Sequence, residues 1–308
     1  MIKRFRSLVE MLKVFPDEQA CIDHLTSIRW RNGEFCPHCG GSVIYHFKDH
    51  RSHKCAACRQ RFSIKVGTIF EDSKISLQKW FMAIYLITSH KKGISSIQLS
   101  KDIAVTQKTA WFMMHRLREA SNTKSFLMPL KNEVEVDETY IGGKERNKHV
   151  SKRVGGTQGR NTTSKTAAVA LVERGGEIRT FKVEDVTTRT LNHLIANNVA
   201  LGSKLFTDDF KAYTGLAPFY THRVVKHGEG EYVIGDVHVN TAEGFFSQFK
   251  RGLVGIYHLM SKKHLHRYLN EFAFRYNMRA QPNGEGFTAL LSNIEGRLPY
   301  KVLTANEG

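Results

Sequence analysis

The sequence has no apolar run long enough to span a membrane. Its longest, from Trp80 to Ile87, is far shorter than the roughly 20 residues that a spanning helix needs. A signal-peptide core is missing as well, because Glu10, Lys13 and Asp17 interrupt the segment that follows the basic N-terminus. We therefore expect an intracellular protein without a membrane partner.

Acidic residues are scarce relative to basic ones. The 308 residues include 46 Lys and Arg against 29 Asp and Glu, which gives a formal net charge of +17. Such an imbalance favours a polyanion as partner, most often nucleic acid, although some basic proteins have no such partner. The length allows two or three domains.

Cysteine is rare too, yet four of the five cysteines follow one pattern. Cys36 and Cys39 form one C-x2-C pair, and fifteen residues separate it from the second pair, Cys55 and Cys58. This spacing predicts a zinc ribbon in which four thiolates bind one Zn²⁺ tetrahedrally. Two disulfides are the alternative, but they require an oxidising compartment, for which nothing in the sequence argues. Cys21 lies outside the pattern, and we expect it to be buried.

The segment 93–111 matches a helix-turn-helix pattern. A short helix, a turn at 103–105 and a second helix capped by Thr106 follow one another. The second helix offers four candidate DNA-binding residues, which are Gln107, Lys108, Thr109 and Arg116. The same pattern also occurs in purely structural helical hairpins.

The second half of the chain changes to alternating strands and helices. We expect strands over 134–141, 165–173, 176–183 and 204–209, a helix over 187–199, and a further helix from about 240 to 250. Three strands, a helix, a fourth strand and further helices are the element order of an RNase H-like domain. The predicted fold is therefore α+β and multidomain, with a zinc ribbon and a helix-turn-helix before an RNase H-like α/β domain.

A long basic segment interrupts this second half. Residues 144–165 contain seven Lys and Arg against one Glu and show no apolar periodicity. We interpret the segment as a loop that tracks a phosphate backbone, or alternatively as a solvated insertion without a partner. The candidate DNA-binding residues in it are Lys144, Arg146, Lys152 and Arg153.

Three carboxylates lie at positions that can form a metal site in an RNase H-like domain. Asp137 and Asp208 lie at strand ends, and Glu243 lies in the first turn of a helix for which Asn240 or Thr241 is the expected N-cap. Metal-dependent phosphodiester chemistry needs about three carboxylates that converge on two Mg²⁺ ions. The pattern predicts such a site, with Mg²⁺ or Mn²⁺ as the catalytic cofactor.

Five stretches resemble a known family. They are RWRNGEFCPHCG (29–40), VEVDETYIGGK (134–144), FTDDFKAY (206–213), HVNTAEGFFSQFKRG (238–252) and HLHRYLNEFAFRYNMR (264–279). Together they resemble bacterial insertion-sequence transposases of the DDE type, in the ISXO-like group with an N-terminal zinc ribbon. The resemblance implies a cytoplasmic enzyme that associates with the nucleoid when it is bound to DNA.

The resemblance also implies residue roles. Asp137 and Asp208 match the two family aspartates, and Glu243 matches the glutamate, with 34 residues between Asp208 and Glu243. Lys250 takes the place of a basic residue that contacts DNA near the active site. Asn240 is the alternative third metal ligand, because some members are described with Asn in place of the glutamate.

The implied function is binding of terminal inverted repeats in double-stranded DNA, followed by strand cleavage and transfer into target DNA. Joining two ends implies a homodimer or higher oligomer. A catalytically inactive, domesticated DNA-binding regulator and a hydrolytic nuclease are the alternatives. The expected domains are 1–70 (zinc ribbon), 71–120 (helix-turn-helix), 121–132 (linker), 133–295 (catalytic domain) and 296–308 (tail).

Overall fold

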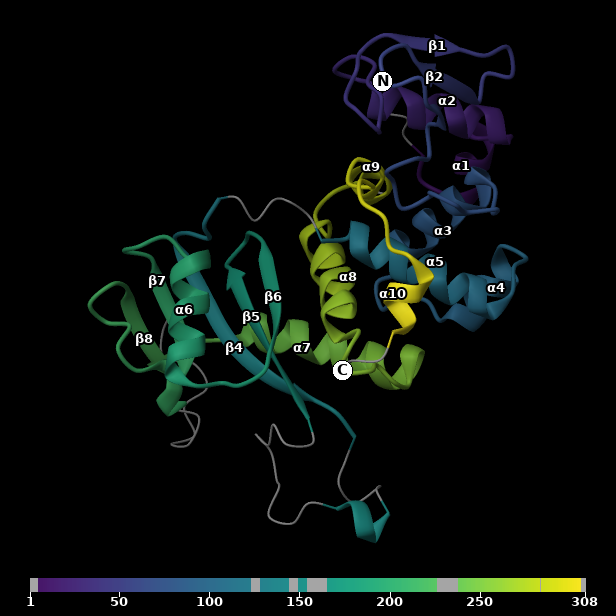
Figure 1. Ribbon diagram of the computed structural model, residues 1–308. Helices are drawn as coiled ribbons and strands as arrows, with labels where there is room; N and C mark the ends of the chain where they lie inside the picture. The colour runs from purple at the N-terminus through teal and green to yellow at the C-terminus, as the bar shows by residue number, and fades with distance from the viewer. Residues whose placement is uncertain are drawn as a thin grey trace. The chain divides into compact units, whose positions relative to one another are not determined.

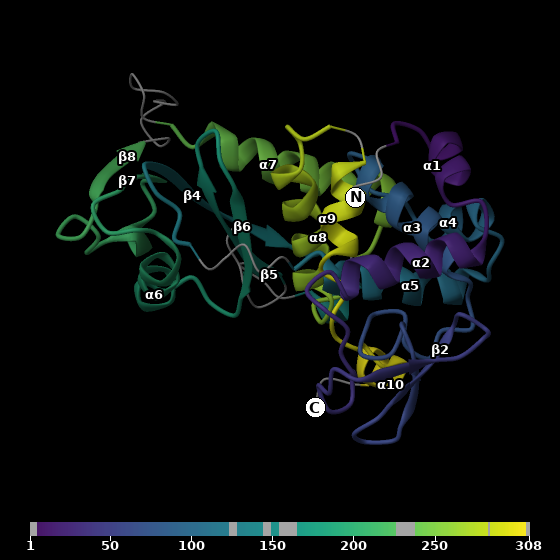
Figure 2. The same ribbon diagram turned by 90° about the horizontal axis from the view of Figure 1, so that it is seen from above.

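The computed structural model describes residues 5–122, 128–143, 149–153, 165–225, 238–282 and 284–305. Its elements are drawn in Figure 1 and, turned by 90°, in Figure 2. The described residues divide into two units. The first contains residues 5–122 together with those of 278–305, and the second contains those of 128–277.

The first unit begins with two helices and a small sheet. Helices α1 (Leu8–Val14) and α2 (Glu18–Arg29) precede strands β1 (Ile44–His46), β2 (Ser52–Cys55) and β3 (Arg61–Ser63), which pair antiparallel in the order β1-β2-β3. Asp17 starts α2 as a cap, since its carboxylate accepts a hydrogen bond from the backbone N–H of Ala20 at 2.8 Å. The β-ribbon that the cysteine spacing predicts is thus present.

Helices make up the rest of the first unit. They are α3 (Leu77–Ser89), α4 (Ser96–Asp102), α5 (Gln107–Ala120), α9 (Glu285–Leu291) and α10 (Tyr300–Thr304). Phe287 of α9 packs edge-on against Phe5 and Phe81, with ring centroids 5.0 and 5.3 Å apart. The segment 278–305 therefore belongs to the first unit, whereas the sequence analysis placed residues 278–295 in the catalytic domain and 296–308 in a tail. Aromatic packing between segments some 200 residues apart decides this grouping.

The second unit is a five-stranded mixed sheet with the order β6-β5-β4-β7-β8. Strand β4 (Glu133–Ile141) pairs antiparallel with β5 (Thr166–Glu173), which pairs antiparallel with β6 (Ile178–Val183). On its other side β4 pairs parallel with β7 (Lys204–Asp208), and β7 pairs parallel with β8 (Thr221–Val225). This is the strand order of the RNase H-like fold, so the predicted fold class is confirmed; β8 is an additional strand that the sequence analysis did not predict.

Helices cover both faces of this sheet. Helix α6 (Thr188–Asn198) packs on one face, where Leu191 and Ile195 join a core with Val134 and Val136. Helices α7 (Asn240–Gly252) and α8 (Leu265–Asn277) pack on the other, where Phe249 and Phe272 share a second core. Short helical turns lie at Val150–Lys152, Lys211–Tyr213 and Leu253–Tyr257. Among the helices that the structure describes, none has the length and apolar character needed to cross a membrane.

Candidate metal centres and active site

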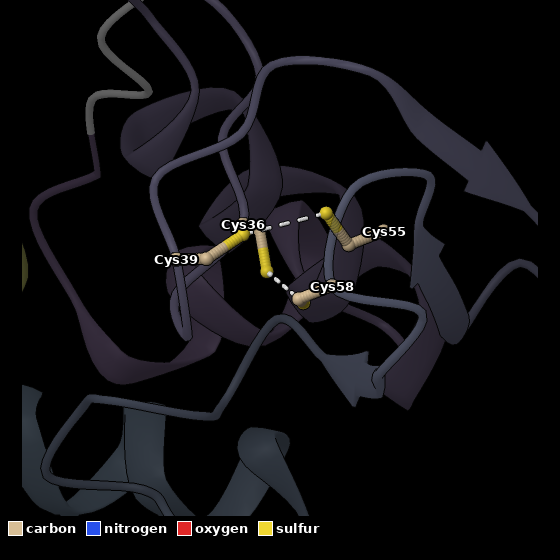
Figure 3. Close-up of side chains that lie close together, drawn as sticks. All are labelled: Cys36, Cys39, Cys55 and Cys58. Atoms are coloured by element: carbon tan, nitrogen blue, oxygen red, sulfur yellow. Dashed lines mark hydrogen bonds between the residues drawn. The ribbon is translucent and has the colours of Figure 1, made fainter.

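The four predicted zinc ligands converge in the first unit. The Sγ atoms of Cys36 and Cys58 lie 3.7 Å apart and those of Cys39 and Cys55 lie 3.6 Å apart, as Figure 3 shows. A tetrahedral site with Zn–S bonds of about 2.3 Å places its sulfur atoms roughly 3.8 Å from one another. All four sulfur atoms lie within 4.8 Å of one another, so they fit a structural Zn²⁺ ion.

Glycines allow the knuckles to close around this point. Gly40 has a φ of +77°, a conformation that favours glycine. A Cβ on Gly41 would stand 3.3 Å from the Sγ of Cys55 and 3.5 Å from that of Cys39, so a side chain there would crowd the ligands. Cys21 is buried in α2 and lies outside the cluster, as expected.

Asp137 and Asp208 lie side by side on neighbouring strands, Asp208 at the end of β7 as predicted but Asp137 in the middle of β4 and not at its end. The parallel register pairs Glu133 with Lys204 and Glu135 with Phe206, and its continuation by two residues sets Asp137 against Asp208. In both strands successive side chains point to opposite faces of the sheet, and Val134 and Leu205, which are paired in the register, point to the same face. Because Val134 and Leu205 belong to the core under α6, Asp137 and Asp208 belong to the opposite face, which α7 covers.

Glu243 is close enough to Asp137 for its charge to raise the pKa of that aspartate. Burial, followed by the negative charges of Glu138, Asp208 and Glu243, raises the pKa of Asp137 to about 8. A carboxyl group that resists ionisation next to other carboxylates is a site where a cation would be stabilising. The arrangement therefore has the donor chemistry and the charge that a divalent metal centre needs.

The three carboxylates are less tightly gathered than the cysteines. In the described part of the chain, the four cysteines are the only group of three or more His, Cys, Asp or Glu residues whose ligand atoms all lie within 4.8 Å. Ligands of two ions that are themselves about 3.5–4 Å apart need not touch one another.

Glu135 is a site residue that the sequence analysis missed. Its side chain is fully buried, and its carboxylate accepts hydrogen bonds from the backbone N–H groups of Thr241 and Ala242 at 2.8 and 3.0 Å. The Nε of Arg174 also donates to it at 2.8 Å, and a terminal nitrogen of Arg174 donates to the carbonyl oxygen of His238 at 2.8 Å. Strand β4 thus holds the first turn of the helix that carries Glu243.

This network replaces the cap predicted for α7. Val239 occupies the N-cap position without a side-chain hydrogen bond, so the prediction of Asn240 or Thr241 as N-cap was wrong. The first N–H groups of α7 are satisfied instead by the carboxylate of Glu135, more than a hundred residues earlier in the chain. The side chains of Asn240, Glu243 and Lys250 are all exposed.

Glu138 lies on the opposite face of β4 from Asp137. The hydroxyl of Tyr213 donates a hydrogen bond to its carboxylate at 2.7 Å, and both side chains are buried. Burial, followed by the charge of Glu138, raises the pKa of Tyr213 well above its usual value. Glu138 is therefore tied to the α6 side of the sheet, whereas Asp137 lies on the α7 side.

The helix-turn-helix forms as predicted, with α4 and α5 joined by a turn in which Ala104 has a φ of +50°. Gln107 and Lys108 are exposed at the start of α5. The Nε2 of Gln107 donates to the hydroxyl of Ser96 at 2.8 Å. Thr109 is half-buried, and its backbone N–H donates to the capping hydroxyl of Thr106.

Arg116 does not belong to this exposed surface. Its side chain is 4% exposed, and it donates hydrogen bonds to the carbonyl oxygens of Ile69, Glu71 and Leu298 at 2.7, 2.8 and 3.2 Å. The prediction of Arg116 as a DNA-binding residue was wrong. Three backbone carbonyls compensate the charge that the sequence analysis assigned to DNA binding.

The basic segment is described only in part. Lys144 and Arg146 lie outside the described residues, and for Lys152 the backbone alone is described, within the short turn Val150–Lys152. Arg153 is exposed at the end of that turn. The roles predicted for these four residues stay predictions.

Comparison with known proteins settles the family. The ISXO2-like transposase domain family matches residues 129–277, and a transposase zinc-ribbon domain family matches residues 16–61. An uncharacterized protein in transposable element ISH50 of Halobacterium salinarum is 33% identical over 292 residues, which cover 91% of this chain and 98% of that protein. The chain belongs to the ISXO2-like transposase family.

The two family matches divide this transposase-family chain as its fold does. The zinc-ribbon match contains α2 and all four cysteines, and the transposase-domain match ends at Asn277, where the second unit also ends. Two solved structures are also similar. The strand transfer complex of Mos1 covers 66% of this chain and 78% of its own at 14% identity, and a pre-cleavage Mos1 transpososome covers 62% and 74% at 15% identity. Both have a TM-score of 0.21.

Proposed function

We propose that this chain is an active transposase that cleaves and joins double-stranded DNA at the terminal inverted repeats of its own element. The observation that carries the proposal is the placement of Asp137 and Asp208 in adjacent register on the sheet face covered by α7. Besides burial, the negative charges of Asp208 and of Glu243 on that helix raise the pKa of Asp137. An inactive, regulatory descendant would have no need to retain this set.

The residues of the site would bind the cations and hold them against the DNA. Asp137, Asp208 and Glu243 would be the ligands of two Mg²⁺ or Mn²⁺ ions, which, when bound, activate the attacking oxygen and stabilise the leaving one. Asp137 must lose its proton to act as a ligand, and its neighbours Asp208 and Glu243 make a cation the natural replacement for that proton. Asn240 and Lys250 would support the site from the exposed side of α7.

The reaction would proceed in two displacements at phosphorus. In the first, water attacks a phosphodiester at the element's end, the bond from phosphorus to the 3′ oxygen breaks, and that oxygen takes up a proton to become a 3′-OH. In the second, this 3′-OH attacks a target phosphodiester and displaces a new 3′ oxygen. Because two ends are joined, the active form would be a dimer or a larger assembly.

Recognition of the terminal repeats would come from the first unit. Gln107, Lys108 and Thr109 stand at the start of α5, where a recognition helix meets base edges. The zinc ribbon would lie beside them as a second contact. In the second unit, Lys144, Arg146, Lys152 and Arg153 would contact phosphates, in keeping with the net charge of +17.

A cleavage and joining assay tests this function. DNA that flanks the reading frame is incubated with the protein and Mg²⁺ or Mn²⁺, and the variant Asp208→Asn is compared with Asp209→Asn, its exposed neighbour. Loss of a metal ligand removes several kcal/mol of transition-state stabilisation, so Asp208→Asn should slow cleavage by about a thousandfold or more. Asp209→Asn should cut like wild type. Equal activity of both variants, or cleavage without any joining, would overturn the proposal.

A further inference from the structure

The turn between α7 and α8 exposes two apolar side chains on a rigid base. Val254 is 73% exposed and Leu259 is 80% exposed. The hydroxyl of Tyr257 donates to Glu271 of α8 at 2.6 Å, and the ring of Tyr257 packs edge-on against Tyr268 at 5.0 Å. Met260, next to Leu259, is buried in the core between the sheet and α8. The turn is therefore fixed in place while it holds Val254 and Leu259 out in solvent.

The backbone of this turn contains a π-helical turn and a residue with positive φ, two features that are frequent at functional sites. Residues Leu253–Tyr257 form a π-helical turn directly after α7. His258 has a φ of +58° and a ψ of −39°, which is uncommon for a residue with a side chain, and the N–H of Leu259 donates back to the carbonyl of Tyr257 at 2.6 Å. Strain of this kind persists only where the surrounding packing imposes it. Here the packing aims Leu259 outward.

The surroundings of the two apolar side chains are strongly positive. Between Gly244 and Asn270 the chain contains five Lys and Arg and no Asp or Glu. Lys250, Arg251, His258 and Lys262 are exposed, and Lys263 is partly exposed. This excess of positive charge favours a phosphate backbone over a second copy of this chain, which also carries +17.

The turn also lies within reach of the candidate active site. Glu243 and Arg251 are eight residues apart on the same helix, which corresponds to about 12 Å along its axis. DNA rises about 3.4 Å per base, so this distance spans roughly three to four base steps. Glu243, Ser247 and Lys250 are exposed positions spaced three to four residues apart on α7, and the exposed Val254 follows four residues later in the turn.

We propose that the α7–α8 turn, residues 252–263, binds the DNA end three to four bases from the cut phosphodiester. Arg251, Lys262 and Lys263 would contact phosphates, while Val254 and Leu259 would pack against bases that are opened from the stack. Proteins that distort duplexes insert apolar side chains between bases in this way, with basic residues on the flanking phosphates. The inference rests on the proposed function, because it takes the DNA at Glu243 as its reference point.

The phosphate contacts are tested by the salt dependence of binding. The double variant Lys262→Gln/Lys263→Gln is compared with Lys131→Gln/Arg189→Gln, which removes the same charge from exposed positions elsewhere on the second unit. Each phosphate contact contributes about 0.9 to the slope of log K against log[salt]. The slope of the first variant should fall by about 1.8 relative to wild type, and that of the second should not change. An unchanged slope in the first variant would overturn the proposal.

The base contacts are tested by fluorescence. A pre-cut duplex end carries 2-aminopurine three or four positions from its terminus, and unstacking of that base raises its emission. Wild type and Leu201→Ser, which changes an apolar residue 74% exposed on the same unit, should both produce the rise. Val254→Ser/Leu259→Ser should abolish it. An equal rise in all three proteins would overturn the proposal. A change of oligomeric state in Val254→Ser/Leu259→Ser, with DNA binding unaltered, would overturn it as well.

These two measurements do not depend on cleavage. A wild type that binds and unstacks the pre-cut end but never cuts would contradict the proposed function and leave this inference standing. If the wild type cuts and joins DNA but neither variant changes binding or fluorescence, the proposed function stands and this inference is wrong.

Discussion

The buried carboxylate of Glu135 accepts a hydrogen bond from the backbone N–H of Thr241 at 2.8 Å and thereby ties β4 to the start of α7. Asp137 lies two residues further along β4, and Glu243 lies two residues further along α7. One contact therefore sets the distance between two of the three candidate metal ligands. Arg174 compensates the charge of Glu135 from the end of β5, with its guanidinium over the ring of Phe206 at 4.0 Å.

Replacement of Glu135 should destabilise the second unit strongly. The variant Glu135→Gln leaves the Arg174 charge without its buried partner, which typically costs about 3–5 kcal/mol. Glu133→Gln is the matched control, because Glu133 also pairs with Arg174, at 3.3 Å, but its side chain is 32% exposed. Surface pairs of that kind contribute about 0–1 kcal/mol. Urea unfolding measures both values, and similar losses for the two variants would contradict the role assigned to Glu135.

Asp137 should make the metal-free protein less stable as the pH rises. Its pKa is raised to about 8 in the folded protein, against an ordinary value near 3.8. The folded state therefore binds more protons than the unfolded state between these two pH values, so the free energy of unfolding falls across that range and levels off above about pH 8. The Tm of the wild type should drop between pH 5 and pH 8 in the absence of divalent ions.

Two comparisons assign this drop to Asp137. The variant Asp137→Asn should lose most of the dependence, whereas Asp209→Asn, at an exposed position, should keep it. Mg²⁺ at pH 8 should raise the Tm of the wild type and do little for Asp137→Asn, because the ion takes the place of the proton. A wild-type Tm that stays constant over this range would contradict the assignment.

The sequence predicted those features that depend on local pattern. The alternation Val134-Glu135-Val136-Asp137 gave the strand and its two faces, and the cysteine spacing gave the ribbon, because neighbours in sequence decide both. Arg116 was misjudged since its partners are carbonyls 45 to 182 residues away, which no local pattern contains. Glu135 was missed for the same reason, although its position on the Asp137 face of the strand was a signal. The grouping of 278–305 with the first unit depends on packing between the two ends of the chain.

Arg116 and Lys108 should therefore behave in opposite ways, although both are basic residues of α5. Arg116→Gln removes a donor to three backbone carbonyls and should cost about 2–3 kcal/mol of stability. Lys108→Gln should leave the free energy of unfolding within about 0.5 kcal/mol. It should instead reduce the slope of log K against log[salt] for DNA by about one phosphate contact, or 0.9. Unfolding curves and salt titrations of the two variants together distinguish the roles. A reduced salt slope with unchanged stability in Arg116→Gln would make Arg116 a DNA contact after all.

Zinc should be bound at one ion per chain. The variant Cys58→Ser should lose the ion, because a serine hydroxyl does not replace a thiolate at neutral pH, and residues 36–58 should then exchange their amide hydrogens rapidly. The small sheet has strands of only three to four residues, so we expect it to depend on the ion for stability. Cys21→Ala, outside the cluster, should keep the zinc. Metal analysis and hydrogen exchange measure these outcomes, and a full complement of zinc in Cys58→Ser would rule out the four-cysteine site.

The choice of third metal ligand depends on two residues one turn apart on α7. Asn240 and Glu243 are both exposed, but Glu243 carries a charge that raises the pKa of Asp137, and a carboxylate binds Mg²⁺ better than an amide does. Glu243→Gln keeps the shape of the side chain and removes the charge, so it should slow cleavage by about a thousandfold. Asn240→Ala should slow it by about tenfold or less, the equivalent of one hydrogen bond. Ser247→Ala, an exposed position one turn beyond Glu243, serves as the control and should cut normally. All three variants should bind terminal-repeat DNA like wild type, because the proposed recognition residues lie on the first unit. Full cleavage by Glu243→Gln together with loss in Asn240→Ala would make Asn240 the third ligand in place of Glu243.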